Sequence, residues 1–268
     1  MSDATQTSIY SNDVKERSVS TENLQQRLLI NKKYQSKNFS DWLFNRLNVV
    51  SGEIILDVGC GTGAQTSRFL ENIGQNGQVD ALDISESSVT FLNERHKDEA
   101  RLNAVVADMA NLEWLTKTTF KNKYYSLAHA SYSIYYSPSR MSVLNLMAAR
   151  ILPTGRVAVF TPVAPHGMVE IARNFSKIPQ AIDDCFAFGK NFLEPEFRKL
   201  FWEVEIHFFQ SEMIIDSITD FIDFYRATTY YDVEAEQQLR SYAQKQITSQ
   251  GALRYEKNGY LIIGCDKK

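Results

Sequence analysis

Acidic side chains and glycines at regular spacing are the residues that could do chemistry in this chain. Asp57 is followed by glycine at every second position, at Gly59, Gly61 and Gly63. Glycine tolerates positive φ and lets a ligand come close to the backbone. An apolar run, residues 54–56, precedes the acid, and a helix-compatible segment follows the glycines. Because a first helical turn offers unpaired N–H groups, this stretch predicts a binding loop between a strand and a helix.

Two more aspartates follow apolar runs further along the chain. Asp83 ends a predicted strand 24 residues after Gly59, where a carboxylate can accept both hydroxyls of a ribose. Asp108 ends the next predicted strand; Ile84 and Met109 directly follow the two acids. Each aspartate taken alone could simply cap the turn after its strand. Three acids at three successive strand ends, behind a glycine-rich loop, favour one shared binding site.

Residues 56–63 closely resemble motif I of the class I S-adenosylmethionine (SAM)-dependent methyltransferases, commonly written L-D-x-G-C-G-T-G. The resemblance is specific from about Ile54 to Asp108 and architectural beyond. It implies SAM as the cofactor, with one acid on the ribose, another on the adenine amino group, and apolar neighbours on the ring. The residues that it implies for cofactor binding are Asp57, Gly59, Gly61, Gly63, Asp83, Ile84, Asp108, Met109 and, beside the sulfonium, Ala130.

The glycine spacing also fits a dinucleotide-binding loop, because Gly59, Gly61 and Ala64 satisfy G-x-G-x-x-G/A. Asp57 counts against that alternative, since an acid before the loop would repel a doubly anionic pyrophosphate. The ammonium group of SAM tolerates a nearby carboxylate. Asp108, the third acid, also favours SAM over NAD.

The acceptor side is expected to involve tyrosine and histidine. Tyr132 follows the fourth predicted strand, close to Tyr135 and Tyr136, and tyrosine faces favour a cation. His166 follows the fifth strand, and histidine can act as a general base near neutral pH. We predict that Tyr132 and His166 lie nearest the transferred methyl group, with packed aromatics and a helix cap as the alternatives. His129, inside the fourth strand, is expected to be buried and satisfied.

Strands and helices must alternate to bring these strand ends together, and they do so from Ile54 to Thr161. Repeated βα units predict parallel strands with ligands at their carboxyl ends. We therefore predict an α/β fold: a Rossmann-like parallel sheet with helices on both faces, a late antiparallel strand and a helical insertion after strand five. The late strand is predicted at Tyr260 to Cys265, after a turn at Asn258 and Gly259.

We predict four regions along the chain. Residues 1–50 form an N-terminal helical lid, and residues 51–162 form the SAM-binding core. Residues 163–250 form a mostly helical acceptor-binding insertion with a late strand, and residues 251–268 close the sheet. By resemblance Tyr34, in the lid, touches SAM; plain packing is the alternative.

The bulk properties limit the partners. The net charge of −3 implies no strong basic surface, so a nucleic-acid partner is not expected. Three cysteines without close spacing suggest neither a disulfide framework nor a metal site. No secretory signal or membrane-spanning run is expected, which favours a soluble cytoplasmic protein. A homodimer stays open.

The predicted function is transfer of a methyl group from SAM to a small-molecule acceptor, on oxygen, nitrogen or carbon. Three alternatives remain: a non-catalytic SAM-binding regulator, an NAD-dependent oxidoreductase and an RNA methyltransferase.

Overall fold

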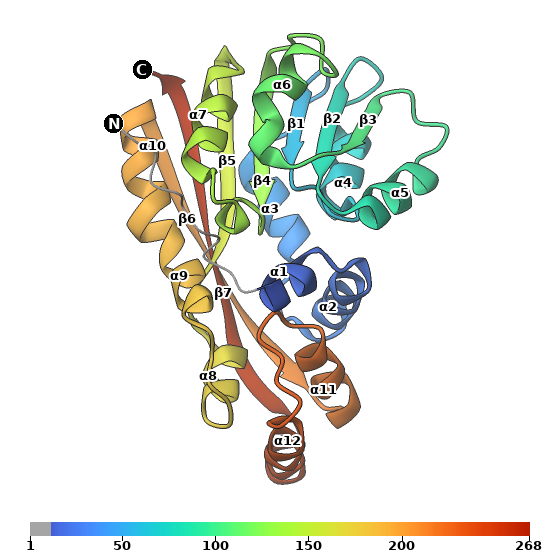
Figure 1. Ribbon diagram of the computed structural model, residues 1–268, viewed down its shortest axis with the longest axis vertical. Helices are drawn as coiled ribbons and strands as arrows, with labels where there is room; N and C mark the ends of the chain where they lie inside the picture. Colours follow the sequence, from blue (N-terminus) through green and yellow to red (C-terminus); the bar gives the residue numbers. More distant parts are fainter. Residues whose placement is uncertain (1–11) are drawn as a thin grey trace.

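A computed structural model describes residues 12–268 (Figure 1). Its strands form one sheet in the order β3-β2-β1-β4-β5-β7-β6, in which neighbours from β3 to β5 run parallel and β7 runs antiparallel to both β5 and β6. The predicted Rossmann-like sheet with late antiparallel pairing is therefore confirmed. The strands are β1 (Ile54–Val58), β2 (Gln78–Asp83), β3 (Leu102–Val106), β4 (Tyr125–Ser131), β5 (Ile151–His166), β6 (Phe201–Ile215) and β7 (Leu253–Lys267).

Helices cover both faces of the sheet, as predicted. One buried cluster joins α3 and α4 to one face, and another joins α6, α7, α9 and α10 to the opposite face. The helices and short turns are α1 (Asn12–Val19), α2 (Thr21–Tyr34), α3 (Phe39–Leu47), α4 (Ala64–Asn72), α5 (Glu86–Arg95), η1 (Met109–Asn111), α6 (Leu112–Lys117), η2 (Ile134–Tyr136), α7 (Arg140–Ala149), α8 (Gly167–Arg173), α9 (Gln180–Phe188), η3 (Gly189–Leu193), α10 (Glu194–Leu200), α11 (Ile218–Arg226) and α12 (Glu236–Gln250).

Strands β5, β6 and β7 extend well beyond the other four strands (Figure 1). Their projecting ends carry α8, α11 and α12, and these elements share a third apolar core with α2. The four predicted regional boundaries stay predictions. None of the helices within residues 12–268 is long and apolar enough to cross a membrane.

The turn predicted at Asn258 and Gly259 is wrong. Both residues lie in the middle of β7 and pair with β5 on one side and β6 on the other. A Cβ on Gly259 would stand only 1.9 Å from Cζ of Phe160. The glycine therefore makes room for a buried ring rather than for a reversal of the chain.

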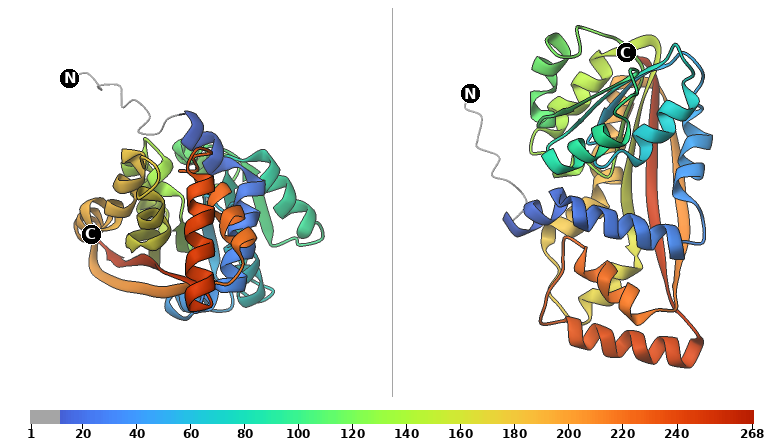
Figure 2. Two further views of the ribbon diagram at one scale, coloured as in Figure 1. Left: turned by 90° about the horizontal axis from the view of Figure 1, so that it is seen from below. Right: turned by 90° about the vertical axis from the view of Figure 1, so that its right-hand side faces the viewer.

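Helix α2 crosses between two parts of the molecule, the parallel strands with their helices and the projecting ends of β5, β6 and β7 (Figure 2). At its start, Oγ1 of Thr21 lies 2.7 Å from Oγ of Ser88 on α5. At its end, Tyr34 donates from its hydroxyl to Oδ2 of Asp220 on α11 (2.6 Å). Tyr34 thus packs on α11 and does not line the cavity described below. The helix is capped by Ser20, whose Oγ accepts from the N–H of Asn23.

Candidate functional site

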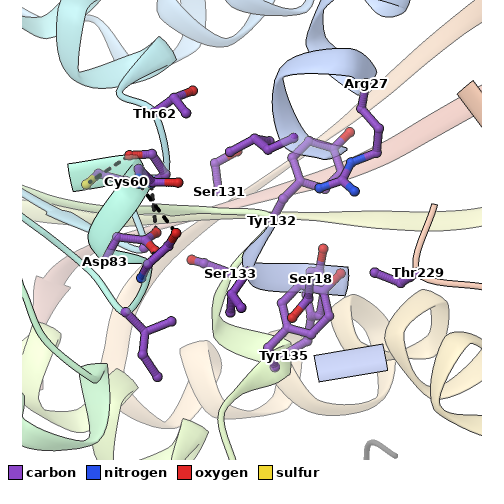
Figure 3. A pocket seen from close by; sticks show the side chains of 18 of the residues that line it. Ser18, Arg27, Cys60, Thr62, Asp83, Ser131, Tyr132, Ser133, Tyr135 and Thr229 are labelled. Carbon is purple, nitrogen blue, oxygen red and sulfur yellow. Dashed lines mark hydrogen bonds between the residues drawn. The ribbon is translucent and has the colours of Figure 1, made fainter. Parts of the chain in front are cut away.

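A cavity of about 410 Å³ lies at the carboxyl ends of the parallel strands, beneath α2 (Figure 3). It extends from the glycine-rich loop after β1 to the region where β5 and β7 leave the main sheet. Nine predicted site residues line it: Asp57, Gly59, Gly61, Asp83, Ile84, Asp108, Met109, Tyr132 and His166. Gly63 and Ala130 do not line it, and their contact with a cofactor stays a prediction.

Positive φ angles at the three alternating glycines shape the loop: 75° at Gly59, 54° at Gly61 and 79° at Gly63. Each glycine also leaves room for a different neighbour. A Cβ on Gly61 would stand 2.8 Å from Cδ2 of Leu24 on α2, and one on Gly63 would stand 2.3 Å from Cδ1 of Leu92 on α5. The loop therefore needs glycine for its conformation and for the close approach of two helices.

Asp83 ties the loop to the end of β2. Its Oδ2 accepts from the N–H of Gly61 (2.7 Å), and its Oδ1 accepts from the N–H of Ser85 (2.9 Å). Burial raises the pKa of this carboxyl, while the two backbone bonds act in the opposite direction. A carboxylate has about four acceptor positions, so both oxygens can still accept from a ligand.

The residues predicted to bind adenine are more exposed to solvent than those of the glycine loop. Asp108 is exposed, and its Oδ1 accepts from the N–H of Ala110, which caps η1. Ile84 is 45% exposed although it is apolar, and Met109 is half-buried. Two apolar side chains beside an exposed acid suit the edge and faces of a planar ring.

The structure pairs Asp57 with His129, a link that our sequence analysis missed. The two residues are register partners in β1 and β4, and both are buried. Nδ1 of His129 lies 2.9 Å from Oδ1 of Asp57, and Thr66 donates from Oγ1 to Oδ2 (2.6 Å). Because Asp57 is the acceptor, the neutral imidazole carries its proton on Nδ1 and leaves Nε2 as an acceptor. His129 was expected to have all its hydrogen bonds made, but it makes one through Nδ1 and none through Nε2.

Polar atoms without a partner are concentrated around the cavity. Seven buried side-chain atoms within the described residues have no hydrogen-bond partner, and four of them belong to residues that line it. Buried polar atoms are normally paired, so this concentration points to a polar ligand. The four atoms are Oε1 of Gln65, Nε2 of His129, Oγ of Ser131 and Nδ1 of His166.

Tyr132 has a φ of 56°, which is unusual for a bulky residue. Its N–H donates to the carbonyl of Phe160 (3.0 Å), and its ring packs on that of Phe160 with centroids 4.9 Å apart. Burial raises the pKa of its hydroxyl, so the phenol stays neutral. Strained backbone of this kind is concentrated at functional sites, which agrees with the predicted role of Tyr132.

His166 is the last residue of β5 and the register partner of Lys257 on β7. Burial, with a smaller contribution from Lys257, lowers the pKa of His166 to about 3. At neutral pH the imidazole is therefore neutral but a much weaker base than the sequence suggested. Burial also lowers the pKa of Lys257 to about 7. Lys257 was not predicted as a site residue because the last strand was expected to begin at Tyr260.

Comparison with known proteins agrees with this geometry. Residues 55–155 match the family model described as a methyltransferase domain. The aklanonic acid methyltransferase DauC of Streptomyces sp. (strain C5) is 29% identical over 122 residues, which cover 44% of this chain and 52% of that protein. The chain spans about half the length of the first curated relatives it matches.

Solved structures share the fold. A protein of Bacillus halodurans C-125 assigned as a methyltransferase superposes with a TM-score of 0.59 at 13% identity, covering 86% of this chain and 99% of its own. A SAM-dependent methyltransferase of Thiobacillus denitrificans, in complex with S-adenosylhomocysteine, gives 0.51 at 12% identity over 84% and 90% of the two chains. Residues 55–155 therefore match a methyltransferase domain, and the sheet that carries them has the fold of these solved structures.

Proposed function

We propose that the chain is an enzyme that transfers the methyl group of SAM to a small-molecule acceptor. One observation supports this most: the glycine loop, Asp83 and Asp108 line one cavity in a chain whose residues 55–155 match a methyltransferase domain. When bound, SAM supplies a methyl group already activated by its sulfonium. The net charge of −3 supports an acceptor other than a nucleic acid, and we place the enzyme in the cytoplasm.

The residues present suit this cofactor. We assign Asp83 to the ribose hydroxyls, and Asp108 with Ile84 and Met109 to the adenine. The amino-acid end of SAM carries an ammonium and a carboxylate, and unpartnered polar atoms of Gln65, Ser131 and His129 line the same cavity. We assign the acceptor nitrogen of His129 to the ammonium group.

Acceptor chemistry is then mainly a matter of position. Holding two reacting groups in line at close distance is worth several kcal/mol, roughly 7–11 at best. We propose that Tyr132 lines the reacting centre and excludes water. His166 would act as a neutral hydrogen-bonding group elsewhere in the cavity and not as a base, because its lowered pKa makes proton abstraction unfavourable. Aromatic side chains of Tyr136 and Tyr230 also line the cavity, which favours an acceptor with planar or apolar parts.

The test is incubation of the purified protein with methyl-labelled SAM and a library of planar small molecules, read by mass shift. The proposal expects labelled product from wild-type protein and at least tenfold less from Tyr132→Ala. A protein that binds SAM but labels no acceptor from an exhaustive metabolite extract would instead support the non-catalytic regulator.

A further inference from the structure

Charge is distributed unevenly along the cavity. Its three carboxylates, Asp57, Asp83 and Asp108, lie at or just after the ends of β1, β2 and β3, at one end of the cavity. At the opposite end the lining residues include Arg27 of α2 and Lys257 of β7, and no carboxylate of the described residues lines the cavity there. In Figure 3, Asp83 and Arg27 lie on opposite sides of Tyr132. The acidic end suits the cofactor, which leaves the cationic end for the acceptor.

Both cations keep hydrogen-bond donors available. Lys257 is only 7% exposed and donates from Nζ to Oδ1 of Asn31 (2.6 Å), which uses one of its three protons. Arg27 donates from Nη1 to the carbonyl of Ala227 (2.6 Å), one of five possible donors. The other groups that face Lys257 include the Phe224 ring of α11, 5.7 Å from Nζ, and its register partners His166 of β5 and Ser211 of β6. The positive charge of Arg27 also lowers the pKa of Lys257. None of these groups offers a compensating negative charge.

Leaving a buried ammonium without a counter-charge is unfavourable, and burial lowers the pKa of Lys257 to about 7. A bound anion would compensate both cations through charge-assisted hydrogen bonds. Within residues 12–268, the carboxylates on the cavity wall lie at its other end, which favours a ligand as the source of the anion.

The position of Lys257 sets the distance to the reacting centre. Ser131, next to Tyr132, pairs with Phe160, and Phe160 pairs with Leu261 on β7. Lys257 precedes Leu261 by four residues, which is roughly 13 Å along an extended strand. The two cations therefore suit a group at the far end of the acceptor and not its methyl-accepting atom.

We propose that Lys257 and Arg27 bind a carboxylate of the acceptor, and that the acceptor class is elongated aromatic or apolar acids. His166, beside Lys257, contributes a neutral hydrogen bond to the same group. This inference rests on the proposed function, since it takes the acidic end of the cavity for SAM. It adds a specificity determinant that lies outside the cofactor motifs.

The test uses protein saturated with S-adenosylhomocysteine and titrated calorimetrically at pH 6.5. The probes are 2-naphthoate, biphenyl-4-carboxylate and anthracene-2-carboxylate, each against its primary carboxamide. We expect at least one carboxylate to bind tenfold or more tightly than its amide. Lys257→Met should abolish that preference and Arg27→Gln should reduce it. Lys32→Met, which removes an exposed charge from the same helix, should keep it.

A second measurement separates direct recognition of the carboxylate by Lys257 from a purely structural role of this side chain. With wild-type protein at pH 8, carboxylate binding should take up close to one proton, measured by calorimetry in two buffers of different ionisation enthalpy. Lys257→Met should take up none. Equal binding of acids and amides, no binding by any of the three acids, or a preference that survives both substitutions would overturn the inference. If wild-type protein does not bind S-adenosylhomocysteine at all, that result would instead overturn the proposed function.

Discussion

Asp83 has two roles that can be separated by experiment. Its carboxylate holds the N–H groups of Gly61 and Ser85, and in our account it also accepts from the ribose. Asp83→Ala should weaken SAM binding by about tenfold to a hundredfold, because a lost charge-assisted bond costs roughly 1.5–3 kcal/mol. Asp98→Ala, in the loop after α5, is the matched control and should bind normally. Isothermal calorimetry on folded variants decides; unchanged affinity would remove Asp83 from the site.

The buried pair of Asp57 and His129 predicts a linked effect on stability and binding. His129→Leu leaves one buried oxygen of Asp57 without a partner, which should lower the free energy of unfolding by about 1–3 kcal/mol. Thr66→Val removes the other bond and serves as control. Only His129→Leu also removes Nε2, so it should weaken SAM binding about fivefold more than Thr66→Val. Equal binding by the two variants would show that Nε2 does not meet the cofactor.

Lys257 predicts a dependence of stability on pH. Its pKa is about 7 in the folded protein against 10.5 ordinarily, so between these values the unfolded chain binds more protons. The free energy of unfolding therefore rises with pH across that window. Lys257→Met should be more stable than wild-type at pH 6, by an amount on the order of a few kcal/mol, and the gain should shrink toward pH 9. Urea unfolding at both pH values tests this. A loss of stability, or a gain independent of pH, would contradict it.

Among the elements, α2 closes the cavity and meets the glycine loop directly. Gly61→Val would place a branched side chain against Leu24 at a φ of 54°, so α2 should be displaced and SAM binding abolished. Gly251→Val is the matched control, because Gly251 also has positive φ but has no atom within 4 Å of an added Cβ. The control should lose only about 1–2 kcal/mol of stability and keep its affinity. Normal SAM binding by Gly61→Val would show that the loop is not the site.

Sequence reasoning succeeded where each element carries its own signal. In β1, β2 and β3 an apolar run leads to an aspartate, and each strand ends within two residues of that aspartate. It failed for β5 and β7, whose lengths depend on tertiary pairing. Pro162 and Asn258 appeared to interrupt the chain, yet they pair with Gly259 and Val163 respectively in the assembled sheet.

The same limit applies to the site. The cofactor loop and its acids are local patterns, so they could be predicted. Arg27, His129 and Lys257 belong to α2, β4 and β7, and only the fold brings them to one cavity. The depressed pKa of His166 is likewise a property of burial, which sequence alone did not provide.

At the scale of the whole molecule, the two parts have different tasks. The parallel strands and their loops provide an acidic end for SAM, while the projecting ends of β5 and β7, with α11, provide a cationic end for the acceptor. Helix α2 spans both ends and touches each through Leu24 and Asn31. The family model matches residues 55–155 only, so in our account the determinants of acceptor specificity lie in the second part.

The central claim is that the acidic end of the cavity binds SAM. The most direct measurement is calorimetric titration of the wild-type protein, in parallel, with SAM, S-adenosylhomocysteine and NAD. Our account predicts one saturable site for the first two ligands and no binding of NAD, because Asp57 opposes a pyrophosphate beside the loop. Tight binding of NAD without a response to SAM would contradict it.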